Sequence, residues 1–158
     1  MKWAVSAASA TICVELAACG FVLPVRIASS AQISLGEIYV EGYQKAGQSN
    51  DAEPGTTNSS AIYVGPAIGN RDLADRIRGP RVTVTIFRHP SPHVVILPTD
   101  NTVWIGRGSA PQNCGMLIYA YRRGKSPDAR WNVNAAELAQ ARKGKLAIYE
   151  ITVGCGRG

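Results

Sequence analysis

The chain has 158 residues, of which 46% are hydrophobic and 18% charged, and its formal net charge is +6. That length allows one domain, and its core would be large enough for the chain to fold without a bound metal. Glycine and proline are plentiful, with 16 and 9 residues, which favours short strands joined by many turns. A basic net charge alone does not indicate a nucleic-acid-binding protein.

The positive charge is concentrated in the later part of the chain. Residues 32–60 hold four acids against one lysine, whereas residues 61–158 hold fourteen Lys and Arg against six acids, a local charge of +8. A basic body of this kind attracts anionic partners such as phosphates, lipid headgroups or acidic glycans.

Residues 3–25 form the most apolar stretch of the chain, and Glu15 is the one charge among these 23 residues. The stretch is long enough to cross a bilayer with some tilt. Lys2 and the free amine precede it, as in the positively charged first region of an export signal. We therefore expect residues 1–31 to form an export signal or a membrane anchor. The body, residues 32–158, is then expected in the periplasm, the cell envelope or the extracellular space.

Three interpretations of this first segment remain open. A long signal would be cleaved after Ala31, with Ser29 and Ala31 at the small-residue positions of the cleavage site. In the second interpretation, residues 16–19 ("LAAC") resemble the lipobox of bacterial lipoproteins. This resemblance implies that Cys19 becomes acylated and attaches the protein to a membrane. In the third, the segment is retained as an anchor; a buried helix of a cytosolic protein is the remaining alternative.

Cysteine usage agrees with export. The body holds two cysteines, Cys114 and Cys155, and a pair in an exported domain predicts a disulfide. Closing a loop of about 40 residues would stabilise the fold by roughly 4 kcal/mol in the chain-entropy model. The alternative is two unrelated buried thiols. Neither zinc-ligand spacing nor a C-x-x-C motif is present, so we expect no metal site and no cofactor.

The body is predicted to be a single α+β or mainly β domain, built around an antiparallel sheet of about five to seven strands with two short helices. In residues 81–88, Val and Ile alternate with Thr, which indicates a half-buried strand. Residues 94–97 are apolar on both faces and are expected in the centre of the sheet. The other expected strands are residues 33–43, 61–65, 102–105, 115–123 and 145–153.

Both predicted helices have recognisable ends. Residues 70–80 are expected to have Asn70 as the cap, to place Leu73 and Ile77 on one helix face and to stop at a Gly-Pro pair. Residues 134–144 have Asn134 as a cap with Glu137 three residues later. Residues 44–60 lack apolar periodicity and are rich in turn formers, which predicts a long loop or a mobile tether.

The cysteines also suggest a strand pairing. If residues 115–123 and 145–153 pair antiparallel, Cys114 lies beside Cys155, and the numbers of opposed residues sum to about 269. Tyr119 would then lie opposite Glu150, and Tyr121 opposite Ile148. The helix between these strands would pack Leu138 over one face of the pair.

Residues 89–93 ("HPSPH") contain the two histidines of the chain. His89 or His93 could act with Glu150 as general acid and base in phosphodiester cleavage. The two histidines could instead bind a metal with Asp100. The simplest interpretation is a rigid, proline-rich loop between paired strands with both histidines exposed.

Candidate anion-binding residues are five cations: Arg107, Arg122, Arg123, Lys125 and Arg130. Arg107 lies between two glycines in residues 105–115, which are expected to form a loop whose amides could hold an anion or which simply connects two strands. If the five cations gathered in space they would form a binding patch. Trp104 or Trp131 could then offer a stacking surface.

The chain lacks a G-x-S-x-G motif and a Cys–His nucleophile pair. The leading hypothesis is therefore an exported, disulfide-fastened envelope or extracellular binding or accessory protein, not an enzyme, with a basic face for an anionic partner. One alternative is a small secreted hydrolase or toxin, nuclease-like, that uses His89 or His93 with Glu150. Another is a structural envelope lipoprotein acylated at Cys19.

Overall fold

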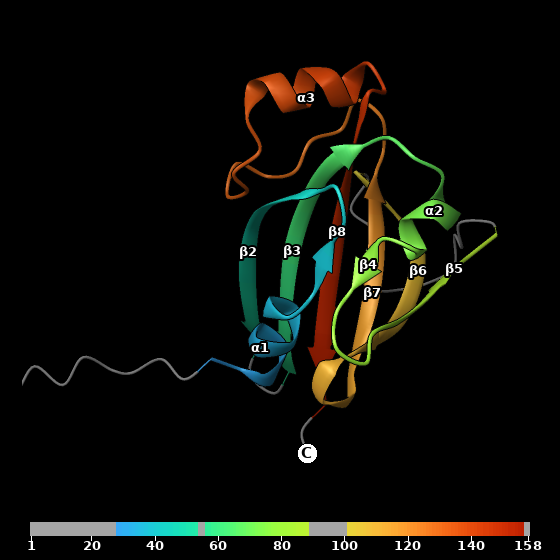
Figure 1. Ribbon diagram of the computed structural model, residues 1–158. Helices are drawn as coiled ribbons and strands as arrows, with labels where there is room; N and C mark the ends of the chain where they lie inside the picture. Colours follow the sequence, from blue (N-terminus) through green and yellow to red (C-terminus); the bar gives the residue numbers. More distant parts are fainter. Residues whose placement is uncertain (1–27, 54–55, 89–100, 157–158) are drawn as a thin grey trace, which may run out of the picture.

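The computed structural model describes residues 28–53, 56–88 and 101–156. Within these ranges, six strands form one antiparallel sheet in the order β2-β3-β8-β7-β6-β5 (Figure 1). This arrangement confirms the predicted fold class. The strands are β2 (Gln44–Glu53), β3 (Thr56–Pro66), β5 (Thr83–Ile86), β6 (Thr102–Ala110), β7 (Cys114–Tyr121) and β8 (Leu146–Cys155).

One face of the sheet carries the main core. It is covered by α1 (Ser30–Gly36), α2 (Asn70–Ala74) and a two-stranded ribbon of β1 (Tyr39–Val40) and β4 (Ile77–Arg78) (Figure 1). We call this face of the sheet the core face. From it, Tyr63, Ile118 and Ile151 point into the core, each at most 1% exposed. Leu35 and Leu73 meet them from the two helices and are fully buried.

The opposite face, which we call the open face, is covered at one end. There α3 (Ala135–Arg142) and the segment before it pack Trp131 and Leu138 against Ile62, Val64 and Ile148. Helix α3 begins as predicted, because Asn134 and Glu137 form a capping box with two 2.9 Å hydrogen bonds. Leu138 packs beside β8, also as predicted.

The predicted pairing of β7 with β8 is confirmed. Its register runs from Gly115 opposite Gly154 to Ala120 opposite Tyr149, and it places Tyr119 opposite Glu150. Cys114 and Cys155 form a disulfide with their Cα atoms 4.4 Å apart. The hydroxyl of Ser34 in α1 donates to the Pro111 carbonyl (2.7 Å) and lies 3.4 Å from Cys114 Sγ.

The loop predicted at residues 44–60 is wrong, since this stretch forms β2 and the first part of β3. The stretch is expected to be a loop because it lacks apolar periodicity, but backbone pairing between β2 and β3 and polar side-chain contacts hold it as two strands. Ser59 is fully buried, and its hydroxyl donates to the Ser49 carbonyl (3.1 Å) and accepts from Gln48 Nε2 (3.2 Å). As an edge strand with one neighbour, β2 needs little of the alternating apolar pattern by which buried strands are recognised.

The strand predicted at residues 33–43 is also wrong over most of its length. A capping box between Ser29 and Gln32 starts α1, and Ala31 and Leu35, four residues apart, are buried on one helix face. The β-branched residues in this stretch favoured a strand, but the capping box and the burial of Ala31 and Leu35 in the core stabilise a helix instead.

The helix predicted at residues 70–80 is shorter than expected. Helix α2 ends at Ala74, and its N-cap is Gly69, which makes no side-chain hydrogen bond, instead of Asn70. Ile77 belongs to β4, where it pairs with Val40. Leu73 and Ile77 are both buried, but they come from different elements and do not share one helix face.

The loop predicted at residues 105–115 is wrong as well. β6 continues to Ala110, and a short 3₁₀ turn (Pro111–Asn113) leads directly into β7. Gly106 and Gly108 are required by close packing, because a Cβ at either position would collide with a carbonyl oxygen of β5. The strands expected around residues 61–65, 81–88 and 102–105 are present, and residues 94–97 lie outside the described ranges.

Candidate functional site

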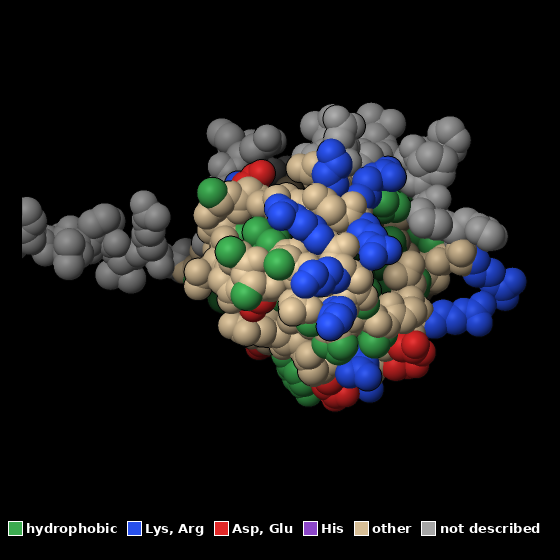
Figure 2. Space-filling view, turned by 90° about the horizontal axis from the view of Figure 1, so that it is seen from above, with side chains coloured by type: hydrophobic (Ala, Val, Ile, Leu, Met, Phe, Trp, Pro, Cys, Tyr) green, Lys and Arg blue, Asp and Glu red, His purple; other side chains and the backbone are tan. Residues whose placement is uncertain are grey.

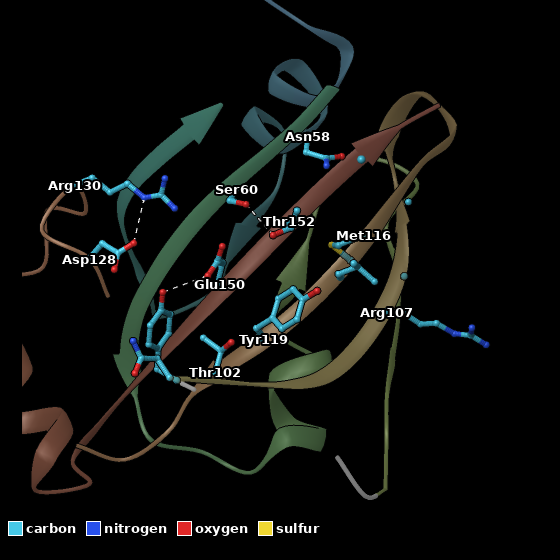
Figure 3. Close-up of a pocket in the computed structure, with 16 residues that line it drawn as sticks. Asn58, Ser60, Thr102, Arg107, Met116, Tyr119, Asp128, Arg130, Glu150 and Thr152 are labelled. Carbon is cyan, nitrogen blue, oxygen red and sulfur yellow. Dashed lines mark hydrogen bonds and ion pairs between the residues drawn. The ribbon is translucent and has the colours of Figure 1, made fainter. Parts of the chain in front are cut away.

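A cavity of about 730 Å³ lies on the open face of the sheet (Figure 3). Its centre is formed by β8 and β7, and its sides by β3, by β6 and by the segment that precedes α3. The residues that line it are Asn58, Ser60, Asn101, Thr102, Arg107, Gly108, Gly115, Met116, Leu117, Tyr119, Tyr121, Asp128, Arg130, Glu150, Thr152 and Gly154.

The alternation of strand side chains explains this lining. In β8, Glu150 and Thr152 face the cavity, whereas Ile151 and Val153 face the core. Where Gly115 and Gly154 are paired, two adjacent strands carry no side chain, which deepens the hollow. A Cβ at Gly154 would come within 2.7 Å of the Asn58 side-chain oxygen, so glycine here makes room for that amide.

Glu150 and two tyrosines form the polar centre of the cavity (Figure 3). The Tyr121 hydroxyl donates to Glu150 Oε2 (3.3 Å), and Tyr119 lies opposite Glu150 in the ladder. Burial and, to a smaller extent, the Glu150 carboxylate raise the pKa of both tyrosines above its ordinary value. Both phenols therefore keep their protons at neutral pH and can donate hydrogen bonds.

The two ends of the cavity have different polar groups. Ser60 and Thr152 share a hydrogen bond of 2.8 Å across β3 and β8. At the other end Asp128 forms an ion pair with Arg130 (3.8 Å), and the Arg130 guanidinium lies 5.2 Å from the centroid of the Trp131 ring. Arg107, at the β6 side, extends away from the other labelled side chains (Figure 3).

A second feature lies at the end of the molecule that carries α3, where Lys and Arg side chains gather (Figure 2). Two segments contribute: the turn after β7 and the stretch from the end of α3 to the start of β8. Their exposed cations, which we call the basic end, are Arg122, Arg123, Lys125, Arg142, Lys143 and Lys145.

The two segments of the basic end are joined directly. Arg123 Nε donates to the Arg142 carbonyl (3.1 Å), so its guanidinium also offsets the negative end of α3. A cavity of about 180 Å³ is lined by Arg122, Arg123 and Lys125 from the first segment and by Gly144 from the second. Gly144, with a φ of 73°, takes the left-handed conformation that ends the helix.

The structure divides the five predicted anion-binding cations between two places. Arg122, Arg123 and Lys125 belong to the basic end, whereas Arg107 and Arg130 line the cavity on the open face. The two proposed stacking surfaces, Trp104 and Trp131, are largely used in packing. The ring of Trp104 makes an edge-to-face contact with that of Phe87, with the two ring centroids 4.5 Å apart, and Trp131 is 5% exposed.

The predicted catalytic constellation is placed in part. Glu150 lines the cavity, while His89, His93, Asp100 and Cys19 lie outside the described residues. Within residues 28–53, 56–88 and 101–156 there is no cluster of three His, Cys, Asp or Glu side chains that could hold a metal ion. The hydrolase hypothesis therefore stays a prediction.

Sequence reasoning missed much of the cavity and half of the basic end. Asn58 and Ser60 lie in the stretch predicted to be a loop, and Arg142, Lys143 and Lys145 lie at the end of a predicted helix and the start of a predicted strand, with no role assigned to them. The usable signal was in β8, where Glu150 and Thr152 are polar at alternate positions between apolar residues.

None of the helices in the described ranges is both long and apolar enough to span a membrane. No protein-family model matches this chain, and comparisons with curated proteins and with solved structures found no match.

Proposed function

We propose that this protein is an exported binding domain, fastened by a disulfide, whose basic end holds an anionic partner in the cell envelope or outside the cell. The Cys114–Cys155 disulfide is compatible with export, because such bonds persist in oxidising compartments. Cys114 is 2% exposed and belongs to the main core, so the bridge is part of the packed fold.

The observation that carries the anionic partner is the gathering of six exposed cations at one end of the molecule. The two acids between β7 and β8 have other roles, since Asp128 pairs with Arg130 and Glu137 caps α3. Among the described residues, none of the six cations of the basic end takes part in an ion pair. Uncompensated exposed charge of this kind attracts polyanions in a salt-dependent manner.

Heparin chromatography tests this proposal. We expect retention at about 50 mM salt and release as added salt screens the charges. The triple variant Arg122→Gln/Arg123→Gln/Lys125→Gln should elute much earlier.

The matched control carries the same change in charge away from the basic end, as Arg71→Gln/Arg81→Gln/Arg88→Gln. It should elute close to the parent protein. Equal shifts of both triple variants would show that net charge alone governs retention. Passage of the parent protein without retention would overturn the proposal.

The folded domain also bears on where the export segment ends. Ser29 caps α1, and Ala31 is fully buried in the main core. Cleavage after Ala31 would remove the cap and cut the first turn of a helix that packs on β3 and β8. We propose that the export segment ends before Ser29, which leaves acylation at Cys19 or retention of the segment as the two forms of attachment.

Intact mass of the protein from its native host tests this boundary. A first residue upstream of Ser29, an acylated Cys19 or an intact Met1 would each support it. A chain that begins at Gln32 would overturn it.

A further inference from the structure

The cavity on the open face has the dimensions of a ligand site. Its volume of about 730 Å³ lies inside the range of roughly 300–1,000 Å³ that small-molecule sites occupy. Four paired strands position most of its lining, and Asn101, Asp128 and Arg130 come from the connecting segments. The paired glycines Gly115 and Gly154 leave the hollow that a ligand would fill.

The charges of the cavity favour a neutral ligand. The lining carries two acids and two cations: Asp128 and Arg130 form an ion pair, Glu150 lies at the centre, and the exposed Arg107 extends away from the others at the rim. The cavity therefore lacks the single-sign field that would select an anion or a cation. In this it differs from the basic end.

The remaining groups form a dense set of directional donors and acceptors beside an aromatic ring. The Glu150 carboxylate accepts from Tyr121 and can accept further hydrogen bonds through its two oxygens, and the phenol of Tyr119 can donate. The mutual hydrogen bond of Ser60 and Thr152 uses one of their two hydroxyl protons, so this pair can still donate and accept. Asn58 and Asn101 add amides that donate and accept at once. Tyr119, half-buried at the centre, offers a ring against which an apolar C–H surface can pack (Figure 3).

We propose that this cavity binds a neutral saccharide. A sugar ring presents vicinal hydroxyls at its rim, which match paired carboxylate, amide and hydroxyl groups, and C–H faces, which match an aromatic ring. Glu150 is the principal acceptor and Tyr119 the packing surface. The site is separate from the basic end, so it goes beyond the anionic partner proposed above.

The experiment is a titration of ¹⁵N-labelled protein with cellotriose, chitotriose and maltotriose, each to about 10 mM, which would detect Kd values near 1 mM. We expect at least one trisaccharide to shift the amide signals of β7 and β8 around Tyr119 and Glu150. Tyr119→Ala and Glu150→Gln should each weaken that binding about tenfold or more. Tyr39→Ala, at a 56% exposed tyrosine of β1 on the other side of the sheet, should leave it unchanged.

Several results would overturn the proposal: no shift with any of the three sugars, shifts confined to the core face, or equal weakening by Tyr39→Ala. If Tyr119→Ala does not fold, Glu150→Gln carries the test, since it keeps the shape of the side chain, and Tyr119→Phe, which keeps the ring, should retain most of the binding. A heparin oligosaccharide added to the bound complex should not displace the sugar. Displacement would mean that both ligands occupy one site, which would overturn this proposal. A protein that binds the sugar but not heparin would refute the anionic partner of the basic end and support the saccharide site.

Discussion

The two faces of the sheet are made by alternate residues of the same strands, yet they differ in almost every property. On the core face, Ile118 and Ile151 are at most 1% exposed and are covered by α1, α2 and the β1–β4 ribbon. On the open face, their neighbours Leu117 and Glu150 line a cavity. The strand period of two therefore places the main core on one side of the sheet and the cavity on the other.

Away from the end that α3 covers, this division predicts that substitutions at core-face positions of a strand cost more stability than those at open-face positions. The largest expected effect on stability concerns the Cys114–Cys155 disulfide, which lies at the edge of the main core. Cys155→Ser opens a covalent loop with a sequence separation of 41, which should cost about 4 kcal/mol in oxidised protein in the chain-entropy model. Thermal unfolding with and without reductant measures it.

After reduction, Cys155→Ser and the parent protein should unfold at nearly the same temperature. An equal loss in both states would mean that packing around the sulfur, and not the bridge, supports this end of the core.

A pair of neighbouring residues in β7 tests the comparison directly. Ile118→Ala removes a fully buried side chain from the core face and should cost about 3 kcal/mol, including the cavity it leaves. Leu117→Ala, on the open face, should cost less than about 1 kcal/mol because Leu117 is only half-buried. Urea unfolding of both variants gives the two values. Similar losses would break the comparison between the faces.

A third prediction concerns alkaline pH. Tyr63 points into the core, its hydroxyl donates to the Ile38 carbonyl (2.9 Å), and burial raises its pKa well above the ordinary 10.0. The unfolded chain releases the phenol proton from about pH 10 upward while the folded protein keeps it. Stability that is complete below pH 10 should therefore fall as the pH rises beyond that value.

Tyr63→Phe removes this titrating group, so the decline in unfolding free energy between about pH 9 and 11 should be shallower. At neutral pH the same variant should be less stable by about 1 kcal/mol or more, because the Ile38 carbonyl loses its donor. An unchanged alkaline slope would show that Tyr63 does not contribute to it.

A further prediction concerns the helix caps on the two faces. Ser29→Ala removes the cap of α1 on the core face, and Asn134→Ala removes that of α3 on the open face; each should cost about 1 kcal/mol. The caps are alike, but α1 buries Ala31 and Leu35 whereas α3 buries no residue completely. Hydrogen exchange should therefore show α3 opening locally in its variant and α1 opening only with the whole domain.

The features that the sequence predicted correctly depend on residues close together in the chain or on the two cysteines. The cap residues of α3 lie three positions apart, and the pairing of β7 with β8 follows from Cys114, Cys155 and two apolar strands. The hairpin of β2 and β3 was missed because its polar residues are held by ladder hydrogen bonds, which leave no apolar pattern. The cavity was missed for the same reason, since it gathers single polar positions from strands far apart in the chain.

The strand order has a consequence for how the protein is made. β8, the last strand in the chain, lies between β3 and β7, so it alone joins the β2–β3 hairpin to the β5–β6–β7 meander. Until β8 has been synthesised, the β2–β3 hairpin and the β5–β6–β7 meander do not pair with each other. Cys155, the second cysteine of the disulfide, is also not yet present. The six-stranded sheet can therefore be completed only after β8 has been synthesised. Deletion of the ten residues of β8 would leave a permanently divided sheet.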